Sequence, residues 1–316
     1  MIDNKKIALI IGISGQDGSY LAHFLLKKDY NVYGSSRDHK NHKFENLKIL
    51  KIFNEINLLT IDPKDFHSIF KEIVKIKPSE IYFLAGQSSV GLSFDLPHET
   101  IESITLGTLN ILEAARMLDY PVRVYHAGSS ECFGETDSKG ASELTNFNPK
   151  SPYAVAKATA SWLIKSYRDS YKLFCCTGFC FNHESPLRPQ RFVTKKIISY
   201  VNKISAGEDI KLSLGNISIS RDWGWAPEYV EAMWLMLQNS NPEDYVIGTG
   251  KSYTLQNFLE IAFEFKGLNW KDYVFIDKNK FRPNEINFNV ANPMKLNQQL
   301  GWSAKVDFKT LVERLF

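Results

Sequence analysis

A chain of 316 residues is longer than one hydrophobic core usually grows, so we expect two lobes that share a cleft. Its 44% hydrophobic and 23% charged residues are ordinary for a globular protein, and no apolar run approaches the roughly 18 residues of a membrane span. The net charge of +3 comes from interspersed residues of both signs, which favours neither a nucleic-acid nor a membrane partner. Residues 1–6 are polar and fit no signal or transit peptide, so we expect a cytoplasmic location.

The first half of the chain alternates short β-branched runs with longer amphipathic stretches, which is the pattern of a parallel sheet covered by helices. Strands are expected at residues 7–11, 31–35, 57–60, 80–84, 122–127 and 174–179. Helices are expected at residues 19–28 and 100–118, and a third runs from Pro152 to about Tyr171 with Ser151 as its N-cap. The sequence therefore predicts a doubly wound α/β fold of the Rossmann type.

After His183 the alternation becomes less regular, with loop signals at residues 184–189, 207–209 and 215–220. We expect residues 1–180 to form the dinucleotide-binding domain and residues 181–316 to form mainly a smaller α/β lobe for the substrate. No linker separates the two parts, so the chain is free to cross between them more than once. The four cysteines lack the paired spacing of a metal site and are expected to be buried free thiols: Cys132, Cys175, Cys176 and Cys180.

A glycine-rich loop, G-I-S-G-Q-D-G, follows the first strand and opens a helix, which is the context of a dinucleotide site. Gly12 permits the tight turn, Gly15 lets backbone amides approach a diphosphate, and Gly18 allows close packing of helix on strand. The alternative is a glycine-rich turn without a ligand. We expect the loop to contact the cofactor through Gly12, Ser14, Gly15, Gln16, Asp17 and Gly18.

The end of the second strand, G-S-S-R, favours NADP over NAD. NAD-specific folds usually place an acidic residue there for the ribose hydroxyl, whereas Ser36 and Arg37 suit a 2′-phosphate, and Asp38 lies one or two residues too late. Asp62 could accept a hydrogen bond from the adenine amine, although an Asp before a proline is also a common turn residue. At the end of the fourth strand, the ribose and nicotinamide should be lined by Leu84, Ala85, Gly86, Gln87 and Ser88.

Tyr153 and Lys157 lie four residues apart on the third predicted helix, so both side chains project from one face. An ammonium close to the phenol should lower the phenol pKa and let Tyr153 take a hydroxyl proton. The alternative is a surface pair without function. Ser129 follows a strand and could share the hydrogen bond to the substrate hydroxyl. This order of glycine loop, serine and Tyr/Lys pair resembles the short-chain dehydrogenase/reductase superfamily.

Glu131 distinguishes between reactions within that superfamily. A simple dehydrogenase or epimerase has no work for a carboxylate at this position, whereas elimination of water next to a ketone needs both a base and an acid. One carboxylate can serve as both. The alternative is a surface glutamate at the start of a loop.

Nearly the whole chain resembles the GDP-mannose 4,6-dehydratase family, in the segments I-G-I-S-G-Q-D-G-S-Y-L, E-I-Y-F-L-A-G-Q-S-S-V, S-P-Y-A-V-A-K, F-N-H-E-S-P, R-D-W-G-W-A-P-E-Y-V-E-A-M-W and F-R-P-N-E-I. The resemblance implies an NADP-dependent, redox-neutral dehydration of a GDP-sugar by a homodimer or homotetramer. It implies catalytic roles for Ser129, Glu131 and Tyr153, cofactor contacts by Lys157, His183 and Arg188, and substrate contacts by Ser89, Asn182, Arg221, Arg282 and Glu285.

Three positions depart from the family pattern. Many members have Thr at the position of Ser129, a usual Asn is replaced by Phe83, and residues 38–46 look shorter than the arginine-rich loop through which some members form tetramers. Two other functions stay open on the same fold: a GDP-4-keto-6-deoxymannose reductase or a nucleotide-sugar epimerase. A more distant alternative is a regulator that binds NADP without turnover.

Overall fold

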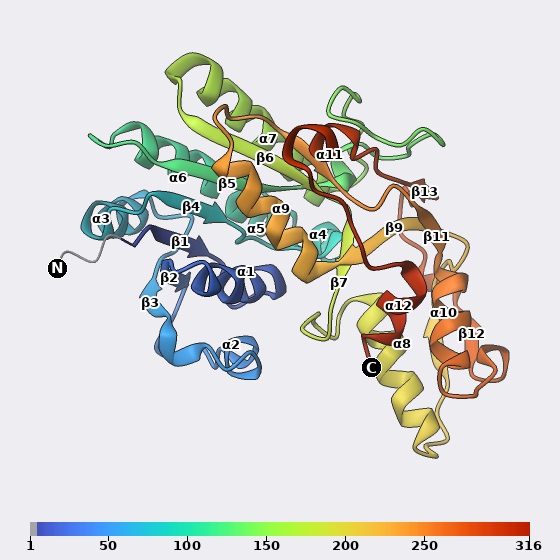
Figure 1. Ribbon diagram of the computed structural model, residues 1–316. Helices are drawn as coiled ribbons and strands as arrows, with labels where there is room; N and C mark the ends of the chain where they lie inside the picture. The colour runs from blue at the N-terminus through green and yellow to red at the C-terminus, as the bar shows by residue number, and fades with distance from the viewer. Residues whose placement is uncertain (1–4) are drawn as a thin grey trace.

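Seven parallel strands form the central sheet of the computed structural model, which describes residues 5–316 (Figure 1). The strand order is β10-β6-β5-β4-β1-β2-β3, and every neighbouring pair is parallel. The predicted doubly wound α/β fold is therefore confirmed. The strands are β1 Ile7–Ile11, β2 Asn31–Ser36, β3 Asn57–Thr60, β4 Glu80–Phe83, β5 Arg123–Ser129, β6 Phe174–Cys180 and β10 Tyr245–Ile247.

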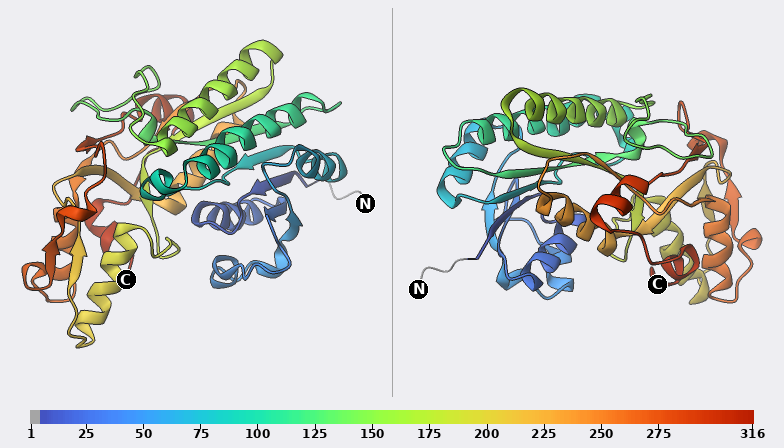
Figure 2. Two further views of the ribbon diagram at one scale, coloured as in Figure 1. Left: turned by 180° about the vertical axis from the view of Figure 1, so that it is seen from behind. Right: turned by 45° about the horizontal axis from the view of Figure 1, so that its top comes forward.

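Both faces of the sheet are buried, and strand alternation assigns each side chain to one face. In β1, Ala8 and Ile10 pack into one hydrophobic cluster while Leu9 and Ile11 pack into another. The first cluster is covered by α1 (Gln16–Lys27) and α9 (Ala226–Gln238). The second is covered by α3 (Phe66–Ile76), α6 (Gly107–Arg116) and α7 (Pro152–Tyr171), and Figure 2 shows helices on both sides of the sheet.

The predicted strands all exist, with ends that differ by at most two residues, and the third helix begins at Pro152 as expected. The expected helix at 19–28 begins earlier, at Gln16. The helix expected at 100–118 exists but is less regular than expected, because α5 (Pro97–Ile101), a π-helical turn η2 (Glu102–Leu106) and α6 follow one another without a break. Single π-turns occur inside α-helices, and the apolar spacing of the sequence does not reveal this one.

A second region lies beside one end of the sheet, coloured yellow to red in Figures 1 and 2. Its sheet is centred on β9 (Ser220–Trp225), which pairs with β7 (Asn182–Glu184), β11 (Ser252–Thr254) and β13 (Phe288–Asn289). Its separate core also contains side chains of β8 (Leu212–Leu214), α8 (Val193–Ser205), α10 (Leu255–Glu264) and α12 (Phe308–Glu313). The shorter elements are α2 Glu45–Ile49, α4 Val90–Asp95, α11 Met294–Leu300 and β12 Val274–Ile276.

The 3₁₀ turns are η1 Phe53–Glu55, η3 Ser130–Cys132, η4 Trp270–Asp272 and η5 Lys278–Lys280. Within residues 5–316 no helix is long and apolar enough to cross a membrane, and no group of His, Cys, Asp and Glu side chains is arranged to hold a metal ion. The four cysteines are buried and unpaired, as the sequence predicts.

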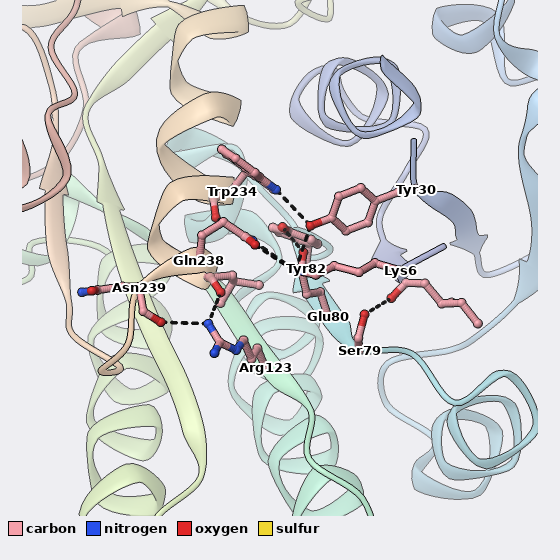
Figure 3. A network of polar contacts seen from close by, with 11 residues as sticks. Lys6, Tyr30, Ser79, Glu80, Tyr82, Arg123, Trp234, Gln238 and Asn239 are labelled. Carbon is pink, nitrogen blue, oxygen red and sulfur yellow. Dashed lines mark hydrogen bonds and ion pairs between the residues drawn. The ribbon is translucent and has the colours of Figure 1, made fainter. Parts of the chain in front are cut away.

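The chain returns from the second region to complete the central sheet, because α9 packs against α1 and β10 pairs with β6. A buried polar network holds α9 in place (Figure 3). Glu80, only 1% exposed, accepts hydrogen bonds from Tyr30 Oη at 3.0 Å, from Tyr82 Oη at 2.8 Å and from Gln238 Nε2 at 3.1 Å. Trp234 Nε1 donates to Tyr30 Oη at 3.0 Å, so two side chains of α9 join the network.

Candidate active site

A cavity of about 430 Å³ lies where the carboxyl ends of the central strands meet the second region. Its walls come from the loop after β4, the end of β5, the first turns of α7, the segment around β7, and residues of the second region. The four residues expected from the sequence to be catalytic all line this one cavity: Ser129, Glu131, Tyr153 and Lys157.

Local structure explains how these side chains reach the cavity. Ser129 is the last residue of β5, and its Oγ accepts a hydrogen bond from Glu131 N at 3.3 Å, which starts the 3₁₀ turn η3. Ser151 caps α7 by accepting a hydrogen bond from Ala154 N at 3.1 Å. The cap fixes the first turn of α7, where Tyr153 lies, and so directs the phenol into the cavity.

Lys157 and Tyr153 are both buried, at 6% and 9% exposed. Lys157 Nζ donates a hydrogen bond to the carbonyl oxygen of Ala127 at 2.7 Å, and burial lowers its pKa to about 8. The groups that lower the phenol pKa are Ser129 and Arg188, and Lys157, which we expected in that role, is not among them. Burial raises the pKa of Tyr153, and the largest opposing contribution is a hydrogen bond from Ser129 instead.

Glu131 lines the same cavity and belongs to a cluster of charged side chains there. Burial raises its pKa, whereas the nearby guanidinium groups of Arg221 and Arg282 lower it. Arg221 Nη2 lies 3.5 Å from Glu285 Oε1, and Arg282 Nη1 lies 3.9 Å from the same oxygen. Opposing influences of this kind suit a carboxylate that both accepts and donates a proton.

The glycine loop fits a dinucleotide. Gly12 has a φ of +99°, and a Cβ there would lie 2.8 Å from Ala85 N, so only glycine is accommodated. Gly15 occupies the N-cap position of α1 without a side-chain cap hydrogen bond. The amides of the first turn of α1 are thus available to a diphosphate.

Asp17 and His183 form an ion pair at the floor of the cavity, with Nε2 and Oδ2 2.9 Å apart. His183 Nδ1 lies 2.7 Å from the carbonyl oxygen of Phe181, so both ring nitrogens face acceptors and the imidazolium form is favoured. Although burial opposes both shifts, the pair raises the pKa of His183 and lowers that of Asp17 to about 2.

Some expected cofactor residues use their side chains for protein contacts and do not line the cavity. Gln16 donates to the carbonyl oxygen of His183 at 3.2 Å and accepts from Ser185 Oγ at 2.7 Å. Gln87 donates to the carbonyl oxygen of Ser89 at 2.8 Å, so it shapes its own loop. Asp62 accepts from Lys64 N at 3.0 Å, which is the turn role that the sequence left open.

At the adenine end of the expected site, Arg37 Nη1 lies 3.4 Å from Glu99 Oε1, and Ser36 Oγ is buried without a hydrogen-bond partner in residues 5–316. Neither lines the cavity. The expected residues that do line it, besides the catalytic four, are Asp17, Leu84, Ser88, Ser89, Asn182, His183, Arg188, Arg221, Arg282 and Glu285. Those that do not are Gly12, Ser14, Gly15, Gln16, Gly18, Ser36, Arg37, Asp62, Ala85, Gly86 and Gln87.

Four charged residues of the cavity wall were missed by the sequence reasoning: Glu184, Arg191, Lys196 and Lys280. Glu184 Oε2 accepts from Thr194 Oγ1 at 2.7 Å and lies 3.3 Å from Arg188 Nε. Three of the four lie in or just after the F-N-H-E-S-P segment, and that adjacency is the signal that could have found them.

Comparisons with known proteins agree with this geometry. A family model described as GDP-mannose 4,6 dehydratase matches residues 9–315. The GDP-mannose 4,6 dehydratase 1 of Arabidopsis thaliana is 44% identical over 325 residues, which cover 100% of this chain and 90% of the plant protein.

Two solved structures share the fold. The UDP-glucose 4-epimerase of Thermus thermophilus in complex with NAD superposes with a TM-score of 0.85 at 25% identity, covering 98% of this chain and 97% of the epimerase. RMD of Pseudomonas aeruginosa complexed with NADPH gives a TM-score of 0.82 at 19% identity and the same coverages of 98% and 97%. The parallel sheet and these neighbours define an extended short-chain dehydrogenase/reductase fold.

Within that class the sequence match is specific. The family model spans almost the whole chain, and the plant relative is similar from end to end. The chain belongs to the GDP-mannose 4,6-dehydratase family.

Proposed function

We propose that the protein is a GDP-mannose 4,6-dehydratase that converts GDP-mannose to GDP-4-keto-6-deoxymannose. The observation that carries the proposal is the position of Glu131, whose carboxyl group lines the same cavity as the phenol of Tyr153. A hydride transfer alone needs only a hydroxyl acid or base, whereas loss of water from the carbons next to a ketone needs a second acid/base group.

The cofactor is a nicotinamide dinucleotide, and we favour NADP. Gly12, Gly15 and the N-terminal amides of α1 would hold the diphosphate, with Lys157 on the nicotinamide ribose. Arg37 and Ser36 at the end of β2 would contact a 2′-phosphate. When bound, the cofactor would supply a hydride acceptor for the oxidation at C4 and a hydride donor for the reduction at C6.

In the first step Tyr153 acts as a base toward the C4 hydroxyl group. The Ser129 hydroxyl donates a hydrogen bond that favours the phenolate and helps to orient the substrate hydroxyl. The Lys157 ammonium, anchored on the Ala127 carbonyl, keeps a positive charge within 5.9 Å of the Tyr153 ring centroid. Loss of the C4 proton to Tyr153 and of the C4 hydride produces the 4-ketone.

In the second step Glu131 removes the C5 proton, which the neighbouring ketone has made acidic. The protonated carboxyl group then donates this proton to the departing C6 hydroxyl, and water leaves. The raised pKa of Glu131 suits the acid half of this cycle, and the partial neutralisation by Arg221 and Arg282 suits the base half. Glu131 gives up its proton to the leaving water, so the proton that C5 needs when the hydride is returned to C6 would come from the C4 hydroxyl proton held by Tyr153, by exchange with solvent. The hydride removed at C4 is returned at C6, so the net reaction is redox-neutral.

The GDP moiety suits the charge of the cavity. Seven Lys and Arg residues line it against four Asp and Glu residues, which favours dianionic diphosphates. We assign the substrate diphosphate to Arg221 and Arg282, the sugar to Ser89 and Asn182, and a ribose hydroxyl contact to Glu285.

We also propose that the two parts of the chain bind different ligands. Residues 1–180 bind the cofactor and residues 181–316 mainly bind the nucleotide sugar, with α9 and β10 returning to the first sheet. We also propose a homodimer or homotetramer in the cytoplasm. Size-exclusion chromatography with light scattering checks the assembly.

A product assay tests the proposed function against its nearest rival. Incubation with GDP-mannose and a catalytic amount of NADP should give a 4-keto-6-deoxy sugar nucleotide, detected by the loss of one water in its mass spectrum, with no net formation of NADPH. A reductase would leave GDP-mannose untouched and consume stoichiometric NADPH when given the 4-keto sugar. An epimerase product would keep the mass of GDP-mannose.

A further inference from the structure

We propose that Arg191 is a further cofactor-binding residue, which leaves the hydroxyl of Ser88 and binds the diphosphate of the dinucleotide when the cofactor enters. This inference rests on the proposed nicotinamide dinucleotide cofactor. It concerns a residue that lies outside the glycine loop, on the other wall of the cavity.

Arg191 connects two walls of the cavity. It lies in the turn between β7 and α8, and its Nη2 donates a hydrogen bond to Ser88 Oγ at 3.3 Å. Ser88 belongs to the loop after β4, which is separated from Arg191 by more than a hundred residues of chain. Both residues line the cavity, so the contact crosses from the second region to the central sheet.

No carboxylate among the described residues forms an ion pair with Arg191. Its neighbour Arg188 lies 3.3 Å from the carboxylate of Glu184, whereas no carboxylate in residues 5–316 raises the pKa of Arg191, which burial and Arg188 lower. The partner that it does have, Ser88, is a neutral hydroxyl. Both guanidinium groups also lie over the ring of Phe192, at 3.7 Å and 5.1 Å from its centroid. A partly buried cation of this kind favours an anionic ligand.

The charged groups around Arg191 indicate that its anionic ligand is the diphosphate of the cofactor. Arg188 is close enough to Asp17, in the first turn of α1, to lower the pKa of that carboxyl group. The pair of arginines therefore faces the side of the cavity where the N-terminus of α1 would hold the cofactor diphosphate. Arg221 and Arg282 form a separate group beside Glu131 and Glu285, so the substrate diphosphate already has its own cations.

Arg191 would exchange Ser88 for the diphosphate because a hydrogen bond to a phosphate is stronger than one to a hydroxyl group. A guanidinium bound to a phosphate makes a charge-assisted hydrogen bond, which is roughly twice as strong as one to a neutral acceptor. The 3.3 Å contact to Ser88 is longer than most N–H···O bonds and is easily replaced. Movement of Arg191 to the diphosphate would keep the turn between β7 and α8 over the bound cofactor.

Equilibrium binding of NADPH to the full-length protein tests this proposal. Titrations followed by nicotinamide fluorescence would compare the wild type with Arg191→Gln and Arg191→Lys. We expect Arg191→Gln to weaken NADPH binding about tenfold to a hundredfold, the range for loss of one charged hydrogen bond. Arg191→Lys should retain part of the affinity because it keeps the positive charge. Lys203→Gln, which makes the same charge change on an exposed part of α8, is the matched control.

Two further ligands show whether Arg191→Gln weakens binding of the cofactor diphosphate in particular or the binding of nucleotides in general. Adenosine 2′,5′-bisphosphate lacks the dinucleotide diphosphate, so its affinity should change less than that of NADPH in Arg191→Gln. GDP should bind equally to the wild type and the variant. Unchanged NADPH binding in Arg191→Gln, or a larger loss for GDP than for NADPH, would overturn the assignment of Arg191 while leaving the proposed function intact. A wild-type protein that does not bind NADPH would overturn both.

Discussion

Lys157 Nζ donates a 2.7 Å hydrogen bond to the carbonyl oxygen of Ala127, the residue two positions before Ser129 in β5. The bond fixes the lysine against the strand whose end carries Ser129 and Glu131. The base of the proposed reaction, its hydrogen-bond partner and the second acid/base group therefore share one rigid junction between β5 and α7.

Replacement of Tyr153 by Phe should block the first hydride transfer. The variant keeps the aromatic ring that packs against Ile104 and Ala156 but lacks the oxygen that accepts the C4 proton. We expect kcat to fall by about 10²- to 10⁴-fold, the usual contribution of a general base. Single-turnover measurements of cofactor reduction check this, with NADPH and GDP affinities as controls for folding. Cofactor reduction at the wild-type rate would remove Tyr153 from the mechanism.

Glu131→Gln should separate the two halves of the reaction. The amide cannot remove the C5 proton, but the first oxidation does not need it, so reduced cofactor and a 4-keto-hexose nucleotide should accumulate on the enzyme. Turnover should fall by about 10²-fold or more. Rapid-quench mass spectrometry would detect the intermediate as a product two mass units below GDP-mannose. A variant with full dehydratase activity would show that another group performs the elimination.

The Asp17–His183 pair predicts a pH window of stability for the cofactor-free protein. The pKa of Asp17 falls from 3.8 to about 2 on folding, so its contribution is present above pH 3.8 and is lost as pH decreases toward 2. The pKa of His183 is raised above 6.5, so its contribution is present below pH 6.5 and is lost as pH rises through the folded value.

Asp17→Asn should therefore destabilise the protein most between about pH 4 and pH 6.5. The loss of unfolding free energy there should be on the order of 2 kcal/mol, and the melting temperature should fall accordingly. The difference from the wild type should shrink on both sides of this window. Thermal unfolding at a series of pH values measures it, with exposed Asp209→Asn as the control. A difference that does not change with pH would mean that the two side chains are not an ion pair.

The buried network at Glu80 predicts a large loss of stability far from the active site. Glu80→Ala leaves the hydroxyl groups of Tyr30 and Tyr82 without their acceptor and releases α9, so we expect a loss of about 3 kcal/mol or more in unfolding free energy. Glu80→Gln keeps the shape and should lose less. Chemical denaturation measures both, and the exposed Glu208→Ala should stay within about 0.5 kcal/mol of the wild type. Equal effects of Glu80→Ala and Glu208→Ala would contradict the role of the network.

The sequence was sufficient to predict the fold and to select Ser129, Glu131, Tyr153 and Lys157, which the structure places in one cavity, because glycine spacing, strand alternation and the i, i+4 rule are local. The sequence could not predict contacts between residues that lie far apart in the chain. Phe83, which stands where the family usually has Asn, packs against Gly107 and His126 in the core. The effect of burial on the Tyr153 pKa and the contact between Arg191 and Ser88 both depend on segments that only the fold brings together.

Transfer of the hydride within one sugar is the central claim, and an isotope label tests it most directly. GDP-mannose carrying deuterium at C4 should give a 4-keto-6-deoxy product that retains the deuterium at C6, with unlabelled cofactor recovered. The reason is that the same cofactor molecule takes the hydride from one carbon and returns it to another. Loss of the deuterium to solvent, or its recovery in free NADPH, would contradict the account.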